Sequence, residues 1–337
     1  MNKVNKMIRR DLNLSILTGV TVLVLLWSAV SFGDAMYSLK NIQSMTFQIP
    51  EFGFLALAMM LSNMIGGIDL SIIANANTVA ITSAYILNGQ WAFGLTGSAR
   101  IVAAVAAAVL VSLLFGLLNG VLISRTSAPP LIATLGTMTL FQGIGMAVTG
   151  GASVGNIDKG FAQMGKATLM QIPLIFWLFL LTAVILGTVM SKSKFGRKLY
   201  LYGDNPTASR FSAIDNDKMC ICTFLLTGVL AGMAGLIVLS RVNSAKVGYG
   251  DSYLLQTLIV CVVGGIDPNG GKGRVWGVLI AVVLMQILSS AFTIMSLSPY
   301  TKKLIWGIML VLVLGLNYAL RKYTNRMELR KSLKEGC

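Results

Sequence analysis

The 337-residue chain contains no histidine, and charged residues make up only 12% of it. Without imidazole it has no histidine general base, no Ser–His or Cys–His nucleophile pair and no histidine ligand for a metal. Soluble domains carry about 25% charged residues. A chain with 55% hydrophobic residues and a mean hydropathy of +0.76 is therefore not a soluble globular protein.

Two further kinds of site are missing from the sequence. The four cysteines contain no CxxC pair, and three of them lie in or beside apolar stretches, which argues against a disulfide or zinc framework. The glycine-rich segment 265–273 is not a phosphate-binding loop, because five residues follow Gly265 before Gly271-Lys272 and Gly273 stands where Ser or Thr is required. The chain is thus expected to have no ATPase motif, no metal and no cofactor of its own.

Acidic residues are scarce, 12 in all, and we expect none of them at the centre of a membrane span. Most fall in predicted loops or tails, and four are predicted at helix ends: Glu51, Asp69, Asp251 and Asp267. An intramembrane carboxylate usually marks proton or sodium coupling. This distribution weighs against an ion-driven carrier and against an intramembrane enzyme with paired carboxylates.

Long apolar runs predict an all-α polytopic membrane protein of about ten transmembrane helices, because about 20 helical residues cross the hydrocarbon core. We place these helices at residues 14–33, 47–65, 69–89, 101–123, 130–149, 172–190, 219–240, 252–265, 275–296 and 303–320. The eighth is short and is expected to be tilted or broken. The apolar stretch after the basic N-terminal residues is predicted to be an uncleaved anchor.

Basic residues set the orientation of this predicted topology. With the N-terminus in the cytoplasm, 19 of the 27 Lys and Arg residues lie on the inner side. The positive-inside rule therefore predicts that both termini are cytoplasmic. We expect one transmembrane domain over residues 1–337, with an N-tail 1–13, an inner loop 191–218 and a C-tail 321–337.

Uncharged hydrogen-bonding side chains inside the spans are candidates for a pathway for a neutral polar solute. The alternative is that such groups join helices to one another. The candidates carried forward are Asn63, Asn75, Asn77, Thr134, Thr137 and Gln142.

The inner loop 191–218 predicts a short helix at about 208–214 after the turn 203–206. Pro206 suits the first helical position, and Asp204 or Asn205 suits the cap before it. A short interfacial helix with an arginine and an aromatic residue is typical of a docking element, whereas a basic loop on anionic lipid is the alternative. The docking candidates are Gly203, Asp204, Asn205, Pro206, Ala208, Arg210, Phe211 and Ser212.

Glycine-rich junctions are predicted at two inner helix ends. Residues 66–69 and 264–267 share the sequence Gly-Gly-Ile-Asp, which suggests internal duplication. Asp69 is expected to cap the helix that follows it. The junction candidates are Gly66, Gly67, Asp69, Gly264, Gly265, Gly271 and Lys272.

Four ordered motifs, within residues 66–71, 129–151, 195–214 and 264–273, give the chain a family resemblance from about residue 47 to 320. It resembles the membrane permease subunits of bacterial ATP-binding-cassette importers for ribose, xylose, galactose and related simple sugars, including furanose-like autoinducer signals. The resemblance implies a type II importer-like permease bundle in the bacterial inner membrane. It also implies that residues 203–214 include the coupling helix that docks on the ATPase subunit.

The same resemblance implies the other components of such an importer. They are a separate ATPase subunit that binds ATP, a second permease that is identical or homologous, an extracytoplasmic solute-binding protein and membrane lipid, with no nucleic acid. Two alternatives stay open at this point: an ion-coupled secondary transporter for a small polar solute, and a nucleoside-importing permease of the same class. The identity of the solute is not encoded in these motifs.

Overall fold

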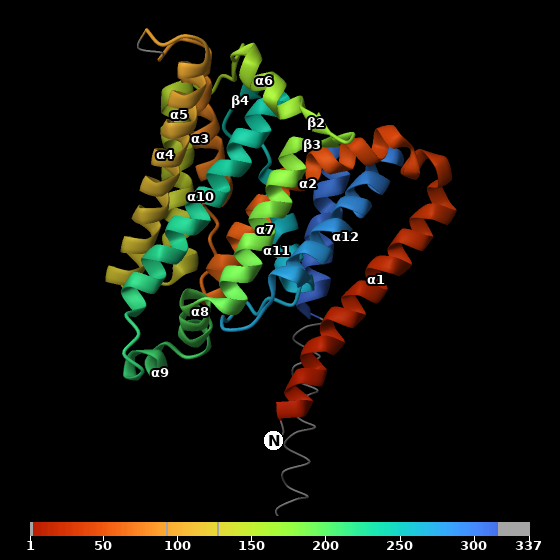
Figure 1. The fold of residues 1–337 in the computed structure, drawn as a ribbon, viewed down its shortest axis with the longest axis vertical. Helices are drawn as coiled ribbons and strands as arrows, with labels where there is room; N and C mark the ends of the chain where they lie inside the picture. The colour runs from red at the N-terminus through yellow and green to blue at the C-terminus, as the bar shows by residue number, and fades with distance from the viewer. Residues whose placement is uncertain (1–2, 92–93, 127, 316–337) are drawn as a thin grey trace, which may run out of the picture.

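A computed structural model of the chain describes residues 3–91, 94–126 and 128–315, and helices dominate it (Figure 1). The transmembrane-length and shorter helices are α1 (Lys3–Tyr37), α2 (Leu39–Met64), α3 (Ile72–Leu87), α4 (Gly97–Thr126), α5 (Pro130–Thr149), α6 (Lys159–Lys166), α7 (Leu174–Lys192), α8 (Lys194–Asp204), α9 (Pro206–Phe211), α10 (Asn216–Val242), α11 (Asp251–Val263) and α12 (Val275–Ile294). A last helix begins at residue 299 and is described to residue 315.

The predicted fold class is confirmed, because each of the ten predicted spans coincides with a helix. Among the described residues, seven helices are long and apolar enough to cross a membrane, and α3 and α11 are shorter apolar helices. The eighth predicted span is indeed short, since α11 has 13 residues. Residues 316–320 of the last predicted span and the predicted C-tail 321–337 lie outside the described residues.

The start of α2 differs from the prediction. This helix begins at Leu39, not at residue 47, because Ser38 caps it by accepting a hydrogen bond from Asn41 N at 3.3 Å. The weakly apolar residues before Phe47 therefore belong to the helix. Glu51, predicted at a helix end, lies in the middle of α2 and is buried.

Helices α2, α3 and α10 contribute much of the interior of the bundle. Every residue of α2 from Ile49 to Met64 is buried, and α10 packs against α2, α3 and α4. Helices α4 and α10 approach closely, since a Cβ at Gly116 would overlap Phe224 O and one at Gly228 would overlap Ser112 O. Small residues allow such close helix crossings in membranes.

Apolar side chains also cover the outside of the bundle. Helices α1, α4, α5 and α7 each bury less than a third of their most apolar window. Helix α1 contacts α12, and toward its N-terminus it extends away from the rest of the bundle (Figure 1). Near its C-terminal end the helix is broken at Gly33, where φ is 43°. An apolar outer surface is what a hydrocarbon environment requires.

The two ends of the bundle differ. One end, called the α9 end here, carries α8, α9 and the first turns of α1, and the opposite α6 end carries α6 and short strands (Figure 1). There β1 (Val154–Gly155) pairs antiparallel with β4 (Ser244–Ala245), and β2 (Thr168–Leu169) pairs with β3 (Ile172–Pro173). Sequence patterns predicted neither the strands nor α6, because two-residue strands leave no period to detect.

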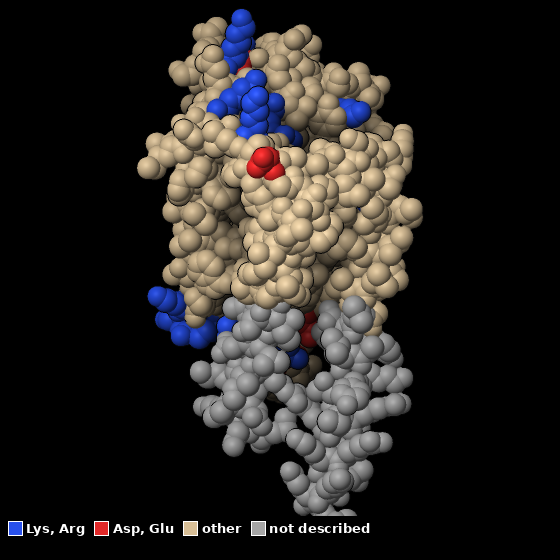
Figure 2. Space-filling view, turned by 90° about the vertical axis from the view of Figure 1, so that its right-hand side faces the viewer, with Lys and Arg blue, Asp and Glu red and all other residues tan. Residues whose placement is uncertain are grey.

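On one face of the molecule, exposed charged side chains lie mainly toward the two ends (Figure 2). Figure 2 shows a broad band of uncharged side chains on one face between basic residues near the top and bottom of the described part. This distribution matches a bundle that crosses a bilayer, since charges are costly in hydrocarbon.

Candidate functional site

The short helix α9 is built by local capping. Asn205 Oδ1 accepts hydrogen bonds from Thr207 N and Ala208 N, each at 3.0 Å, and Pro206 occupies the first helical position. Of the two predicted caps, Asn205 is therefore the cap of α9, and Asp204 is the last residue of α8. The helix starts at residue 206 and not at 208, and it ends at Phe211 because the chain turns at Ala213, where φ is 56°.

Two buried polar side chains fasten α9 to α10. Ser209 Oγ donates to Asn216 Oδ1 at 2.7 Å, and Asn216 Nδ2 donates to Pro206 O at 2.8 Å. The opposite side of α9 is free of such contacts among the described residues, with Arg210 exposed and Phe211 88% exposed. One side of α9 is thus hydrogen-bonded to α10, and the Arg210 guanidinium and the Phe211 ring are exposed.

Replacing Asn216 by alanine is expected to loosen α9 without unfolding the bundle. The change removes both hydrogen bonds, which together contribute about 1–3 kcal/mol, and it leaves the apolar packing of α10 intact. Hydrogen exchange of residues 205–214 should accelerate roughly tenfold or more, while the Tm of the whole protein shifts little. Unchanged exchange in this segment would contradict the role assigned to Asn216.

Two ionisable side chains beside α9, Asp215 and Tyr202, have shifted pKa values with identifiable causes. The hydrogen bonds of Lys218 with Asp215, which caps α10, hold the pKa of the Asp215 carboxyl below its usual range. Burial raises the pKa of the Tyr202 hydroxyl to about 12, so this side chain is neutral. The acidic cap also suits the positive end of the α10 dipole.

A three-way main-chain contact lies directly behind α9. It is called the glycine junction here and consists of Met64, Gly66, Gly203, Gly270 and Gly271. A Cβ at Gly203 would overlap Met64 O and lie 2.5 Å from Gly271 N, and one at Gly270 would lie 2.8 Å from Gly66 N. Gly271 N donates to Met64 O at 2.9 Å. The last turn of α8, directly before α9, therefore lies against the end of α2 and the loops that follow α2 and α11.

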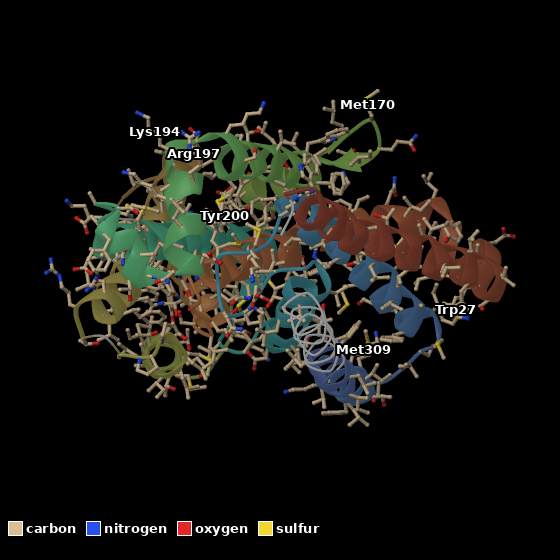
Figure 3. The ribbon with its side chains drawn as sticks, turned by 90° about the horizontal axis from the view of Figure 1, so that it is seen from below. Trp27, Met170, Lys194, Arg197, Tyr200 and Met309 are labelled. Carbon is tan, nitrogen blue, oxygen red and sulfur yellow. The ribbon has the colours of Figure 1, made fainter. Side chains whose placement is uncertain are left out.

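Tyr200 adds a side-chain link to the same loops. Its hydroxyl donates to Gly273 O at 2.8 Å. Seen from the α9 end, Lys194 and Arg197 extend outward from α8, whereas Tyr200 lies on its inward side (Figure 3). Helix α8 is thus anchored to the loop between α11 and α12 through one face.

The two Gly-Gly-Ile-Asp fragments are not equivalent in backbone register. After α2, Gly66 takes the left-handed conformation and Gly67 N donates to Ser62 O; after α11, Gly265 takes it and Ile266 N donates to Cys261 O. The left-handed glycine is therefore the first of the pair in one fragment and the second in the other. Only the aspartates correspond, each accepting from the main-chain N two residues on.

Gly264 and Lys272 have separate local roles. A Cβ at Gly264 would lie 3.1 Å from Gly277 C, so this glycine serves the crossing of α11 with α12. Lys272 Nζ lies 3.8 Å from Asp267 Oδ2 and is largely exposed, where such a pair contributes little to stability.

Asp69 is the centre of a buried hydrogen-bond chain. Its carboxylate accepts from Ser71 N at 2.9 Å, from Ser71 Oγ at 2.7 Å and from Thr227 Oγ1 at 3.4 Å. Asn119 Nδ2 donates to Ser71 Oγ at 2.7 Å, and Thr137 Oγ1 donates to Asn119 Oδ1 at 2.6 Å. The prediction that Asp69 caps the following helix is wrong, because α3 starts at Ile72 and Ser71 is its N-cap residue. Asp69 instead connects α4, α5 and α10 through this chain of hydrogen bonds.

The six pathway candidates occupy different environments. Thr134 is buried and hydrogen-bonded to the loop after α2, donating to Ile68 O at 2.9 Å and accepting from Leu70 N at 3.2 Å. Gln142 is half-buried. Within the described part of the chain, the buried Asn63 Oδ1, Asn75 Oδ1 and Asn77 Nδ2 have no hydrogen-bond partner.

One polar cluster escaped prediction altogether. The buried carboxylate of Glu51 in α2 forms an ion pair with Arg241 Nε, accepts from Arg241 Nη2 at 2.9 Å and accepts from Tyr253 Oη at 3.0 Å. It joins α2, α10 and α11. In the sequence, this cluster is visible only as one acidic and one basic residue in two apolar runs. The two residues are 190 positions apart, so no local spacing relates them.

Comparison with known proteins places this architecture in a family. The family model described as "Branched-chain amino acid transport system / permease component" matches residues 41–314. The ribose import permease protein of Bacillus subtilis (strain 168) is 32% identical over 301 residues, which are 89% of this chain and 90% of the relative. No solved structure matches the chain at a significant level.

Other relatives extend the comparison. The L-arabinose transport system permease protein of Escherichia coli (strain K12) is 30% identical over 271 residues, 80% of each chain. The autoinducer 2 import system permease protein of Yersinia pestis (strain Pestoides F) is 27% identical over 308 residues, 90% of this chain and 85% of the relative. The chain is a multi-pass membrane protein and belongs to the permease-component family of the branched-chain amino acid transport system type.

Proposed function

We propose that this chain is the membrane-spanning permease subunit of an ATP-binding-cassette importer and forms the pathway for a monosaccharide or a related small polar solute. Separate cytoplasmic ATPase subunits bind ATP and drive the cycle, and an extracytoplasmic binding protein delivers the solute. The named relatives import ribose, arabinose and autoinducer 2, which supports this function over an ion-coupled carrier.

The observation that carries the proposal is the position of α9. It is a capped helix with an exposed cation and aromatic ring, and the last turn of α8, directly before it, lies against the loops after α2 and α11. A displacement of α9 by an ATPase subunit would press on two membrane helices at once. Interlocked main chains transmit such a displacement because packed elements deform little.

Orientation follows from the same end of the molecule. The first turns of α1 lie at the α9 end (Figure 1), and the predicted inner side carries 19 of the 27 basic residues. We therefore assign the α9 end to the cytoplasm of a bacterial inner membrane and the α6 end to the outside.

The pathway is proposed to run past the buried carboxamides of Asn63, Asn75 and Asn77. Each has an amide atom without a partner among the described residues, and a buried unpaired polar atom costs free energy. Such atoms are available to bind a passing hydroxyl group. Thr134, Thr137 and Gln142 of α5 complete the proposed lining, with a second identical or homologous permease on the other side of the pathway.

Reversing the charge of Arg210 tests the docking role. Arg210→Glu should lower ATP-driven uptake about tenfold or more, since coupling between sites is typically about 1–3 kcal/mol, while ATP hydrolysis by the importer continues. Lys192→Glu is the matched control, because Lys192 is also exposed at the α9 end but lies outside α9. Equal uptake by both variants at equal expression would refute the proposed coupling site.

A further inference from the structure

A polar cavity of about 370 Å³ opens at the α6 end. It lies between the carboxyl ends of α3 and α5 and the segment around β1. Its lining consists of Tyr85, Asn88, Gln90, Thr149 and residues 152–156. The volume falls within the range of roughly 300–1,000 Å³ found for small-molecule sites.

Several hydrogen-bonding groups in this cavity are unused. The side chains of Gln90, Ser153 and Asn156 make no hydrogen bond with any other residue that the structure describes, and Asn88 uses only Oδ1, which accepts from Gln90 N at 3.0 Å. A carboxamide both donates and accepts. The cavity therefore offers both hydrogen-bond donors and hydrogen-bond acceptors, which neighbouring hydroxyl groups of one molecule require.

An aromatic ring in a fixed orientation forms part of the wall. Tyr85 stacks on Trp91 with ring centroids 4.5 Å apart and an interplanar angle of 17°, and Tyr85 Oη donates to Val148 O at 3.1 Å. A ring held in this way costs little entropy when it contacts a ligand. Aromatic surface combined with a few carboxamides suits the apolar and hydroxylated faces of a sugar ring.

No charged side chain lines the cavity among the described residues. The nearby Arg100 is turned to main-chain oxygens, donating from Nε to Leu95 O at 3.1 Å and from Nη1 to Leu87 O at 3.5 Å. The ammonium and carboxylate groups of an amino acid zwitterion would find no counter-charge in this lining. A neutral solute needs none, because hydrogen bonds alone can bind its hydroxyl groups.

We infer that the cavity formed by Tyr85, Asn88, Gln90, Ser153 and Asn156 is a receiving site for a neutral polyhydroxylated solute of monosaccharide size. This inference rests on the proposed function, because that proposal assigns the α6 end of the bundle to the outside of the membrane. In that orientation, solute occupies the cavity on release from the binding protein and before it enters the bundle. The site selects uncharged sugars over amino acids, although the family description names amino acids.

Saturation-transfer NMR on the full chain in lipid nanodiscs tests this site, because it detects weak binding. The probes are D-ribose, L-arabinose, D-galactose and L-leucine. The double variant Gln90→Ala/Asn156→Gly removes two free carboxamides, and glycine tolerates the left-handed φ of 56° at residue 156. Thr168→Ala is the matched control, since Thr168 is exposed at the same end and outside the cavity.

At least one sugar should give a signal with the wild type and the Thr168 variant and bind roughly tenfold more weakly to the double variant, since each hydrogen bond between neutral groups contributes about a factor of 2–10. L-leucine should give none. Equal sugar signals from the wild type and the double variant, no sugar signal at all, or a dominant leucine signal would overturn the inference. Uptake by the wild-type importer in vesicles, measured in parallel with and without ATP, reports separately on the proposed function.

Discussion

Replacing Gly203 by alanine is expected to abolish ATP-driven uptake. The added Cβ would overlap the carbonyl oxygen of Met64 and lie 2.5 Å from Gly271 N. Both are main-chain atoms joined by a hydrogen bond of 2.9 Å, so neither can rotate away as a side chain would. Overpacking costs about 1–3 kcal/mol even where side chains can adjust, and here the last turn of α8 must separate from the two loops that it contacts.

The measurement is solute uptake together with ATP hydrolysis by the importer in proteoliposomes. With the contact broken, stimulation of hydrolysis by the loaded binding protein should fall about 5–150-fold, the range of ordinary coupling energies. Gly187→Ala is the matched control, because a Cβ there would lie 3.7 Å from Val275 Cβ in an ordinary contact. Wild-type uptake by the Gly203 variant would contradict the role of the glycine junction.

A milder variant separates uncoupling from misfolding. Tyr200→Phe removes the hydroxyl that donates to Gly273 O and adds no atom, so the importer should assemble normally and show intermediate uptake. If the Gly203 variant fails to assemble, the Tyr200 variant still reports on the link between α8 and the loop after α11. Full uptake by an assembled Tyr200 variant would show that this link does not transmit motion.

The helices could be predicted from sequence because their signals are local. An apolar run of sufficient length specifies a span, and Pro206 after Asp204-Asn205 indicated a short helix, although the sequence left the cap open between these two residues and the helix starts at 206, not 208. The error at α2 has the same origin. Residues before Phe47 are only weakly apolar, so hydropathy missed more than two turns of helix that Ser38 caps, and Glu51 was consequently placed at a helix end.

The sites that depend on contacts between distant segments could not be predicted in this way. Met64, Gly203 and Gly271 meet through main-chain atoms, and main-chain contacts leave no pattern of side-chain types in the sequence. The repeated Gly-Gly-Ile-Asp also shows that identical residues need not share a conformation. In each fragment the left-handed glycine is the residue that follows the C-cap of the preceding helix, Ile65 in one and Gly264 in the other.

Removing the base that faces Glu51 is expected to destabilise the bundle strongly. Arg241→Ala leaves a carboxylate that is 1% exposed with Tyr253 Oη as its remaining partner among the described residues. Breaking a buried pair in this manner costs about 3–5 kcal/mol. The thermal unfolding midpoint of the purified protein should fall accordingly, whereas Lys166→Ala, at an exposed base of the same end, should shift it little.

The double variant Glu51→Gln/Arg241→Met tests whether the bundle tolerates loss of the ion pair when no charge is left unpaired. The carboxamide introduced in α2 can still accept from the Tyr253 hydroxyl, and the thioether introduced in α10 retains an apolar chain of similar length, so no charge is buried. Replacing a buried ion pair by neutral groups is often close to neutral in stability. The double variant should therefore unfold nearer the wild-type midpoint than Arg241→Ala does. If the two variants are equally unstable, the unpaired charge on Glu51 is not the cause, and the hydrogen-bonded ion pair between Glu51 and Arg241 itself stabilises the bundle.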